Sequence, residues 1–180
     1  MKKDMSPLKL TIILIVAIFG VVLIVPLFLS DHIVIKAAEE IHAPAKIVFS
    51  EINNLHKQKL WYPFKNDSIT PDSITEPAEG FGAQRMWMKG DTILRKMVIN
   101  KSEPFRYVEA ELLFENKPGA TERWYLSGDS TTTKVRWEFQ VLNLHYPFGR
   151  WLGLIIKNSM QPALETGLKR LKTVSESEVH

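Results

Sequence analysis

Histidine, cysteine and paired carboxylates are the side chains most often used for metal binding and acid–base catalysis, and this sequence offers few in a usable pattern. It has no cysteine, which removes thiolate nucleophiles and cysteine-bound zinc. Its histidines show neither an H-E-x-x-H motif nor a pair four residues apart; they are His32, His42, His56, His145 and His180. We therefore expect no metal centre.

Motifs that bind phosphate or activate a serine are also missing from the sequence. There is no G-x-S-x-G elbow and no Walker loop, and Gly80-Phe81-Gly82 lacks the third glycine of a dinucleotide site. A carboxylate such as Glu109 or Glu111 could act as a pocket acid or base, but no acid/base pair is evident. We expect no cofactor, and we assign no catalytic residue.

Arg95 occupies an unusual place in the pattern. It alternates with Ile93 and Met97, which puts its guanidinium on the apolar face of a strand. A buried guanidinium requires a partner, and we expect either an ion pair with Glu109 or Glu111 or a contact with a ligand carboxylate. The ion pair within the protein is the preferred interpretation. If the opposite face of this strand is buried instead, Arg95 lies in water.

The elements that position these residues begin with an apolar segment, Leu10–Leu29, that holds no charge. At 1.5 Å per residue, a helix of this length crosses the ~30 Å hydrocarbon layer of a membrane. A core helix would show a polar face, which this segment lacks. A cleaved signal peptide is the stronger alternative, because Lys2, Lys3 and Lys9 could form its charged start. However, Pro26–Asp31 offers no small-x-small cleavage site.

We therefore expect residues 1–30 to be a cytoplasmic N-terminus and an uncleaved transmembrane anchor, followed by one domain over residues 31–180. The lysines precede the apolar segment, whereas Asp31 and His32 follow it and Lys36 is the only nearby basic residue on that side. The positive-inside rule then places the N-terminus in the cytoplasm and the domain on the extracytoplasmic side. The membrane is the first expected partner.

The formal net charge of +3 comes mostly from the N-terminal lysines, since 20 Lys and Arg face 19 Asp and Glu after residue 30. The basic residues of the domain are scattered singly among acids. A nucleic-acid binder concentrates them on one face or helix. We therefore expect no nucleic-acid partner.

Six runs of strand character follow the anchor: Ile33–Ile41, Gly82–Met88, Thr92–Lys101, Phe105–Phe114, Thr121–Ser127 and Thr132–Leu142. The connections within the last five are too short for parallel crossovers, so we expect an antiparallel meander. In the last run, Val135, Trp137 and Phe139 share one face while charged residues occupy the other. A sheet with one wet face must be covered on its apolar face.

Two segments show helical spacing. A short amphipathic helix is predicted from Ala45, with Pro44 at its start, and an aromatic cluster at residues 60–64 closes this helical region. A longer helix is predicted from Phe148 to about Val174, with an apolar stripe suited to covering the sheet. Pro162 lies inside it and is expected to kink it.

Six short sequences within this pattern carry a family resemblance: residues 41–45 (IHAPA), 60–64 (LWYPF), 80–83 (GFGA), 108–114 (VEAELLF), 133–137 (TKVRW) and 165–172 (ETGLKRLK). Together they resemble the SRPBCC superfamily, in particular its START-like, polyketide cyclase/dehydrase-like members. The resemblance covers roughly Ile33 to Glu176. It implies an α+β helix-grip fold, in which a curved antiparallel sheet wraps around a long C-terminal helix, here preceded by one transmembrane helix. None of these sequences is catalytic.

The resemblance also implies a cavity between the sheet and the terminal helix. For any one large apolar residue an ordinary core position is the commoner role, but as a group they indicate an apolar interior. The candidate lining residues are Trp61, Phe64, Trp87, Arg95, Leu112, Phe114, Trp124, Trp137, Phe139, Ile156, Met160 and Leu164.

Three functions fit this pattern. The preferred one is a membrane-tethered module that binds an apolar or amphiphilic small molecule, such as a lipid or isoprenoid. The second is a cyclase or dehydratase that uses a pocket carboxylate such as Glu109 or Glu111. The third is an interaction protein whose pocket is filled by its own side chains. A pocket volume separates the third from the others, and a pocket carboxylate with a raised pKa favours the enzyme.

Overall fold

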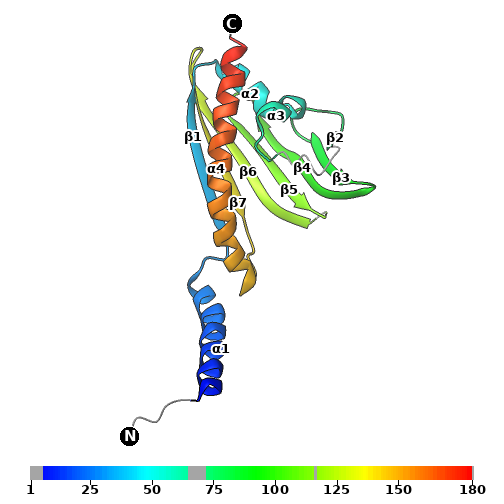
Figure 1. Ribbon diagram of the computed structural model, residues 1–180. Coiled ribbons are helices and arrows are strands. Elements are labelled where there is room, and N and C mark those ends of the chain that lie inside the picture. The colour runs from blue at the N-terminus through cyan, green and yellow to red at the C-terminus, as the bar shows by residue number, and fades with distance from the viewer. Residues whose placement is uncertain (1–5, 65–71, 116, 180) are drawn as a thin grey trace.

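Figure 1 shows a computed structural model of the chain, which describes residues 6–64, 72–115 and 117–179. The helices are α1 (Pro7–Ile24), the 3-10 helix η1 (Val25–Phe28), α2 (Ala45–Asn53), α3 (Leu55–Trp61) and α4 (Phe148–Ser177). The strands are β1 (Ile33–Ile41), β2 (Asp72–Ile74), β3 (Gln84–Lys89), β4 (Thr92–Glu103), β5 (Tyr107–Phe114), β6 (Lys117–Gly128) and β7 (Thr133–Val141).

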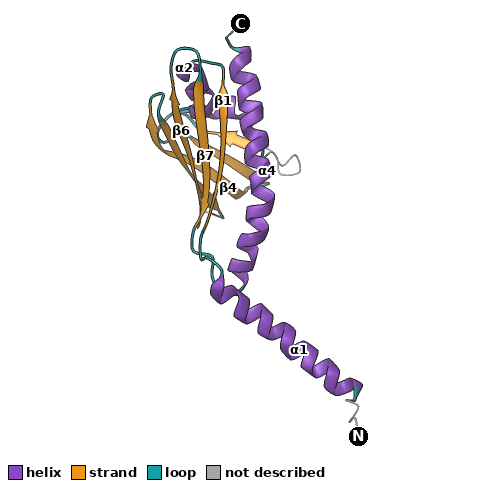
Figure 2. Cartoon of the chain, turned by 90° about the vertical axis from the view of Figure 1, so that its left-hand side faces the viewer, coloured by secondary structure: helices purple, strands orange, loops and turns teal. Residues whose placement is uncertain are grey.

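The seven strands form one antiparallel sheet in the order β1-β7-β6-β5-β4-β3-β2. From β2 to β7 each strand pairs with the next in sequence, as the short connections predict. β1 closes the order by pairing with β7, where Ala37 lies opposite Trp137. The predicted α+β helix-grip fold is therefore confirmed, and α4 lies along the inner side of the sheet (Figure 2).

The sheet is curved, and its register explains where it bends. The pairing shifts between Trp87 and Met88, between Ile99 and Lys101, and near Leu112. An extra residue on one strand of a pair bends that strand and increases its twist. The extra residues are Leu94 and Asn100 of β4 and Gly119 of β6, and β4 belongs to the part of the sheet that turns away from β1 in Figure 1.

One face of the sheet is buried and the other is wet. In β7, Val135, Trp137 and Phe139 are buried, whereas Lys134 and Arg136 are exposed. Because successive side chains of a strand point to opposite faces, this alternation assigns the apolar side of the whole sheet. The buried face provides most of the hydrophobic core.

α4 covers the apolar face, and its C-terminal half lies closest to it. Leu164, Leu168 and Leu171 are buried there, and Gly167 lies between them. A Cβ atom added to Gly167 would meet Cζ3 of Trp137 at 2.8 Å and Cδ of Pro63 at 2.9 Å. Glycine is therefore needed for this close approach, although it weakens the helix itself.

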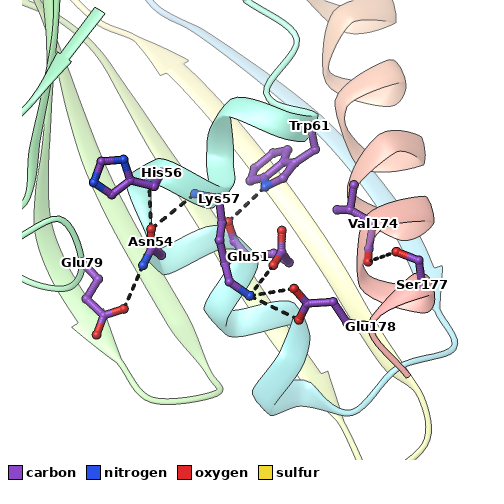
Figure 3. A network of polar contacts seen from close by, with 9 residues as sticks. All are labelled: Glu51, Asn54, His56, Lys57, Trp61, Glu79, Val174, Ser177 and Glu178. Atoms are coloured by element: carbon purple, nitrogen blue, oxygen red, sulfur yellow. Dashed lines mark hydrogen bonds and ion pairs between the residues drawn. The ribbon is translucent and has the colours of Figure 1, made fainter. Parts of the chain in front are cut away.

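A polar network ties the same end of α4 to α2 and α3 (Figure 3). The Lys57 ammonium group lies 2.7 Å from the buried Glu51 carboxylate and 2.8 Å from Glu178. Burial raises the pKa of Glu51, and the Lys57 charge opposes that rise. Removing one partner from such a contact leaves a buried charge without compensation, so the network favours this arrangement of the helices.

The structure contains two elements that the pattern did not predict. The short strand β2 extends the sheet at its edge, and α3 follows α2 after a break at Asn54. Asn54 has an extended backbone, and its side chain accepts hydrogen bonds from the backbone N–H groups of His56 and Lys57. This cap begins a second helix, which continues the helical region to Trp61, within the aromatic cluster that was expected to close it.

The N-terminal apolar segment projects away from the domain (Figures 1 and 2). Residues Pro7–Phe28 have a mean hydropathy of 3.1, and none of the side chains of α1 is buried. This is a helix long and apolar enough to cross a membrane. The part before residue 6, which holds Lys2 and Lys3, lies outside the described residues.

We expect that Gly167→Val lowers the free energy of unfolding by about 1–3 kcal/mol, because the new side chain overpacks the contact with Trp137. The control is Arg170→Val, which places the same β-branched residue at an exposed position of α4 and should cost less than about 1 kcal/mol. Guanidinium unfolding of the detergent-solubilised chain, followed by tryptophan fluorescence, measures both. Equal losses in the two variants would contradict the close approach.

Candidate ligand-binding site

A cavity of about 730 Å³ lies between the sheet and the N-terminal half of α4. Its lining is mostly apolar and comes from β5, β6, β7, the loop after β7 and α4. The volume falls in the range of about 300–1,000 Å³ that is typical of small-molecule sites. The cavity is therefore large enough for a ligand.

The sheet wall of the cavity follows from strand alternation. Leu112 of β5 lies opposite Ala120 of β6, and both side chains point to the inner face. Phe139 and Val141 continue the same face in β7. The residues between them in sequence point to the wet face, so the inner wall carries almost no polar groups.

The helix wall is formed by Leu152, Ile156 and Met160, which are spaced by four residues and so lie on one face of α4. The space exists because these side chains fit less closely to the sheet than those near Gly167. Leu164 is fully buried, whereas Ile156 and Met160 are only partly buried. Leu152 is half exposed, so this end forms the mouth of the cavity.

The inner end of the cavity carries a positive charge, Arg95. Its guanidinium carbon lies 3.7 Å from the centroid of the Trp87 ring, and its Nη2 donates to the Phe64 carbonyl at 3.1 Å. Burial lowers the pKa of Arg95, and the negative charge of Glu122 opposes that effect. A guanidinium nevertheless stays protonated in proteins. An anionic group that enters the cavity would therefore meet a cation here.

A buried carboxyl group, Glu122, lies behind Arg95. It is 0% exposed, and the Tyr62 hydroxyl donates to its Oε1 at 2.5 Å. Burial raises the pKa of Glu122 to about 7, opposed by the Tyr62 hydrogen bond, the charge of Arg95 and the nearby Trp137 N–H. Its Oε2 has no hydrogen-bond partner among the described residues. Glu122 therefore exchanges its proton near neutral pH.

The structure places the twelve sequence candidates in two groups. Along the cavity lie Phe64, Arg95, Leu112, Phe114, Phe139, Ile156 and Met160. In the closed core lie Trp61, Trp87, Trp124, Trp137 and Leu164. Three of these tryptophan rings pack against one another, with centroids 5.4–6.5 Å apart. The rings fill the space beneath the C-terminal half of α4 and leave the cavity to smaller side chains.

Arg95 lies on the inner face as expected, but its expected ion-pair partners do not. Glu109 lies on the opposite face, where it accepts hydrogen bonds from Tyr107 and from Arg123 at 2.7 Å each. Glu111 is on that face too, because both alternate with buried apolar residues of β5. The acid–base role considered for these two carboxylates is therefore not supported by their position.

Glu122 and Tyr62 were missed as site residues, although the sequence holds a signal for the carboxylate. Glu122 alternates with Ala120, Trp124 and Leu126, so a charged residue occupies the apolar face of β6. This is the same pattern that identified Arg95 in β4. Tyr62 carries no comparable signal, because its contact spans 60 residues of sequence.

Solved structures share this architecture at low sequence identity. A protein of unknown function from Staphylococcus aureus has a TM-score of 0.60 at 8% identity, with 83% of this chain and 96% of that chain covered. A protein from Thermus thermophilus has a TM-score of 0.58 at 14% identity, with 82% and 100% covered. A protein of the dynemicin biosynthetic locus has a TM-score of 0.54 at 15% identity, and the match covers 80% of this chain and 46% of that chain. These likenesses show the fold alone.

No curated protein matches the sequence. The family model described as "Polyketide cyclase / dehydrase and lipid transport" matches residues 32–176, which hold every described strand, α2, α3 and nearly all of α4. The match begins immediately after the apolar segment and leaves that segment out. From Pro7 to Phe28 the chain is therefore an addition to the matched domain. The domain that carries the cavity belongs to the polyketide cyclase/dehydrase and lipid transport family.

Proposed function

We propose that this domain binds an apolar or amphiphilic, lipid-like small molecule in the cavity under α4, and that the N-terminal apolar segment tethers it to a membrane. The observation that carries the proposal is a cavity of about 730 Å³ whose walls are apolar and whose inner end holds one guanidinium. Burial of a hydrocarbon chain in such a space contributes roughly 0.8 kcal/mol per CH₂ group. The family description, which includes lipid transport, supports the same class of ligand.

Arg95 favours an anionic head group at the inner end of the cavity. Among the described residues that line the cavity, it is the only lysine or arginine. Within the described part of the chain, Glu122 is the carboxylate whose charge acts on Arg95; when Glu122 is protonated, a ligand carboxylate would provide the negative charge. A fatty acid combines that head group with a chain suited to the walls. The volume of the cavity also argues against a pocket filled by the protein's own side chains.

The tether is supported by the length and hydropathy of residues Pro7–Phe28. In the proposed arrangement the N-terminus lies in the cytoplasm and the domain lies on the extracytoplasmic side, following the lysines that precede the apolar segment. A tethered domain stays within reach of lipids, which are concentrated in the bilayer. Location and ligand class thus support each other.

An enzyme of the cyclase or dehydratase type is the second candidate, and Glu122 is the observation that favours it. A carboxyl group with a pKa of about 7 is suited to general acid–base catalysis near neutral pH. However, Glu122 is fully buried behind Tyr62 and is not among the residues that line the cavity. A group must reach the reacting atoms to act on them, so binding remains the preferred function.

We expect that Ala120→Leu weakens the binding of a long-chain fatty acid about tenfold or more, because the larger side chain fills part of the cavity; tenfold corresponds to about 1.4 kcal/mol. The matched control is Thr121→Leu, the same change at the next residue, which points to the wet face of β6. Displacement of a fluorescent fatty acid from the detergent-solubilised chain measures both. Unchanged affinity in Ala120→Leu would place the ligand elsewhere.

The role of Arg95 is tested by comparing a fatty acid with the fatty alcohol of equal chain length. In Arg95→Met the affinity for a fatty acid should fall roughly 10- to 100-fold, because a charge-assisted hydrogen bond contributes about 1.5–3 kcal/mol. The affinity for the fatty alcohol of equal chain length should change little. If both ligands lose affinity equally, Arg95 supports the shape of the cavity and does not hold a head group.

Glu122 makes stability depend on pH. Its folded-state pKa of about 7 lies above its ordinary value of 4.5, so the folded protein holds this proton more tightly than the unfolded chain. Its stabilising contribution is complete below pH 4.5 and is lost as pH rises to about 7. We expect this loss to be about 3 kcal/mol, and Glu122→Gln should remove it.

The control for this experiment is Glu109→Gln on the wet face. Partial burial raises the pKa of Glu109, but hydrogen bonds from Tyr107 and Arg123 lower it overall, so its contribution to stability disappears as pH falls. The two substitutions should therefore change the pH profile in opposite directions. Unfolding free energies measured from below pH 4.5, where Glu109 acts, to above pH 7, where the Glu122 contribution is lost, test the pair. A Glu122→Gln profile parallel to the wild-type profile would contradict the buried proton.

A further inference from the structure

Pro26 interrupts the backbone hydrogen bonding at the end of the apolar segment. Proline has no N–H, so the carbonyl group of Val22, four residues earlier, lacks its usual helical donor. Trp151 Nε1 donates to this carbonyl at 3.1 Å, and the Tyr146 hydroxyl donates to the carbonyl of Leu23 at 2.7 Å. Side chains from the loop before α4 and from its first turn thus satisfy backbone groups that α1 leaves open.

A third contact completes this junction. Arg150 Nη1 donates to the carbonyl of Pro26 at 2.8 Å. In Figures 1 and 2 the end of α1 lies beside the start of α4, at the opposite end of the domain from its C-terminus. With α1 in a bilayer, these contacts hold the first turns of α4 at the level where the helix leaves the hydrocarbon. Trp and Tyr are enriched at that level of membrane proteins.

The surface at this junction is apolar and open. Phe148 is 72% exposed and Ile155 is 65% exposed, although both lie in α4, whose other half is packed into the core. Phe28, at the end of η1, is 85% exposed. Phe148 and Ile155 are seven residues apart and so share one face of α4, and η1 contacts this helix. Exposed apolar side chains on adjoining elements form a patch, which marks an interaction surface more often than a single exposed residue does.

The charge of this region suits a phospholipid surface. Between Glu138 and Glu165 the sequence has no acidic residue, whereas Arg150 and Lys157 are basic. One acidic residue, Asp31, lies beside this stretch, where its carbonyl accepts a hydrogen bond from Leu144 N–H, so the two basic residues outnumber it. Basic residues beside an apolar patch favour contact with anionic head groups. An acidic protein partner would meet the same charges, but the junction with α1 brings this patch to the bilayer.

The mouth of the cavity belongs to the same surface. Leu142 and Leu152 line the cavity, and each is 51% exposed. We propose that residues 142–156 insert into the head-group region of the bilayer, so that the cavity opens onto lipid and not onto water. This inference rests on the proposed tether and adds a defined lipid-contact surface, the membrane-facing lip, which consists of residues 142–156.

The absence of native cysteine allows a direct test with the full chain. Single-cysteine variants Leu142→Cys and Ile155→Cys in the lip, Ile15→Cys in α1 and Thr173→Cys at the far end of α4 are labelled with an environment-sensitive fluorophore. They are reconstituted into vesicles of phosphatidylcholine and phosphatidylglycerol that contain doxyl-labelled phosphatidylcholine as a quencher. We expect a large loss of fluorescence at positions 142, 155 and 15, and little loss at 173, which is exposed and distant from the junction.

The outcomes distinguish a failure of the membrane-facing lip from a failure of the proposed tether. If either lip position behaves like position 173 while position 15 is quenched, the tether stands and the membrane-facing lip is wrong. If position 15 also escapes quenching, the tether itself is wrong, and the inference falls with it. Fluorescence-detected gel filtration of each variant before reconstitution confirms that the label reports on folded protein.

Discussion

The contact between Gly167 of α4 and the Trp137 ring of β7 determines where the domain is solid and where it is hollow. At this point the helix backbone lies so close to the sheet that a Cβ atom would collide with the ring. One long helix cannot stay that close along a curved sheet over 30 residues. The C-terminal half of α4 therefore closes the core, and the N-terminal half leaves a cavity of about 730 Å³.

The polar groups at the inner end of the cavity depend on the same arrangement. Tyr62, Glu122 and Arg95 lie where the closed core meets the cavity, and burial dominates the pKa shift of each. Burying charge is costly, and a proton on Glu122 reduces that cost by removing one charge. Arg95 then remains a cation that faces the apolar cavity. A charged Arg95 beside a protonated Glu122 is better suited to binding an anionic head group than an Arg95 already paired with a carboxylate of the protein would be.

Local patterns in the sequence predicted the strands, the wet and apolar faces, the covering helix and the inward direction of Arg95, because each depends on residues close in the chain. The preferred partner of Arg95, an ion pair with Glu109 or Glu111, was predicted wrongly, although the alternation around Glu122 pointed to the inner face. Whether Trp124 or Phe139 lines the cavity could not be predicted, since that depends on the distance between α4 and the sheet at each level. The hydrogen bonds from Trp151 and Tyr146 to α1 link residues more than 120 positions apart, beyond any local pattern.

The central claim is that the cavity under α4 holds a lipid-like molecule. Native mass spectrometry of the full chain, released from detergent micelles after purification from membranes, tests it most directly. The account predicts a bound species with the mass of a fatty acid or related lipid, at one copy per chain, which is lost when Ala120 is replaced by Leu and retained when Thr121 is. A chain that carries no adduct in any preparation, or an adduct equally abundant in both variants, would contradict it.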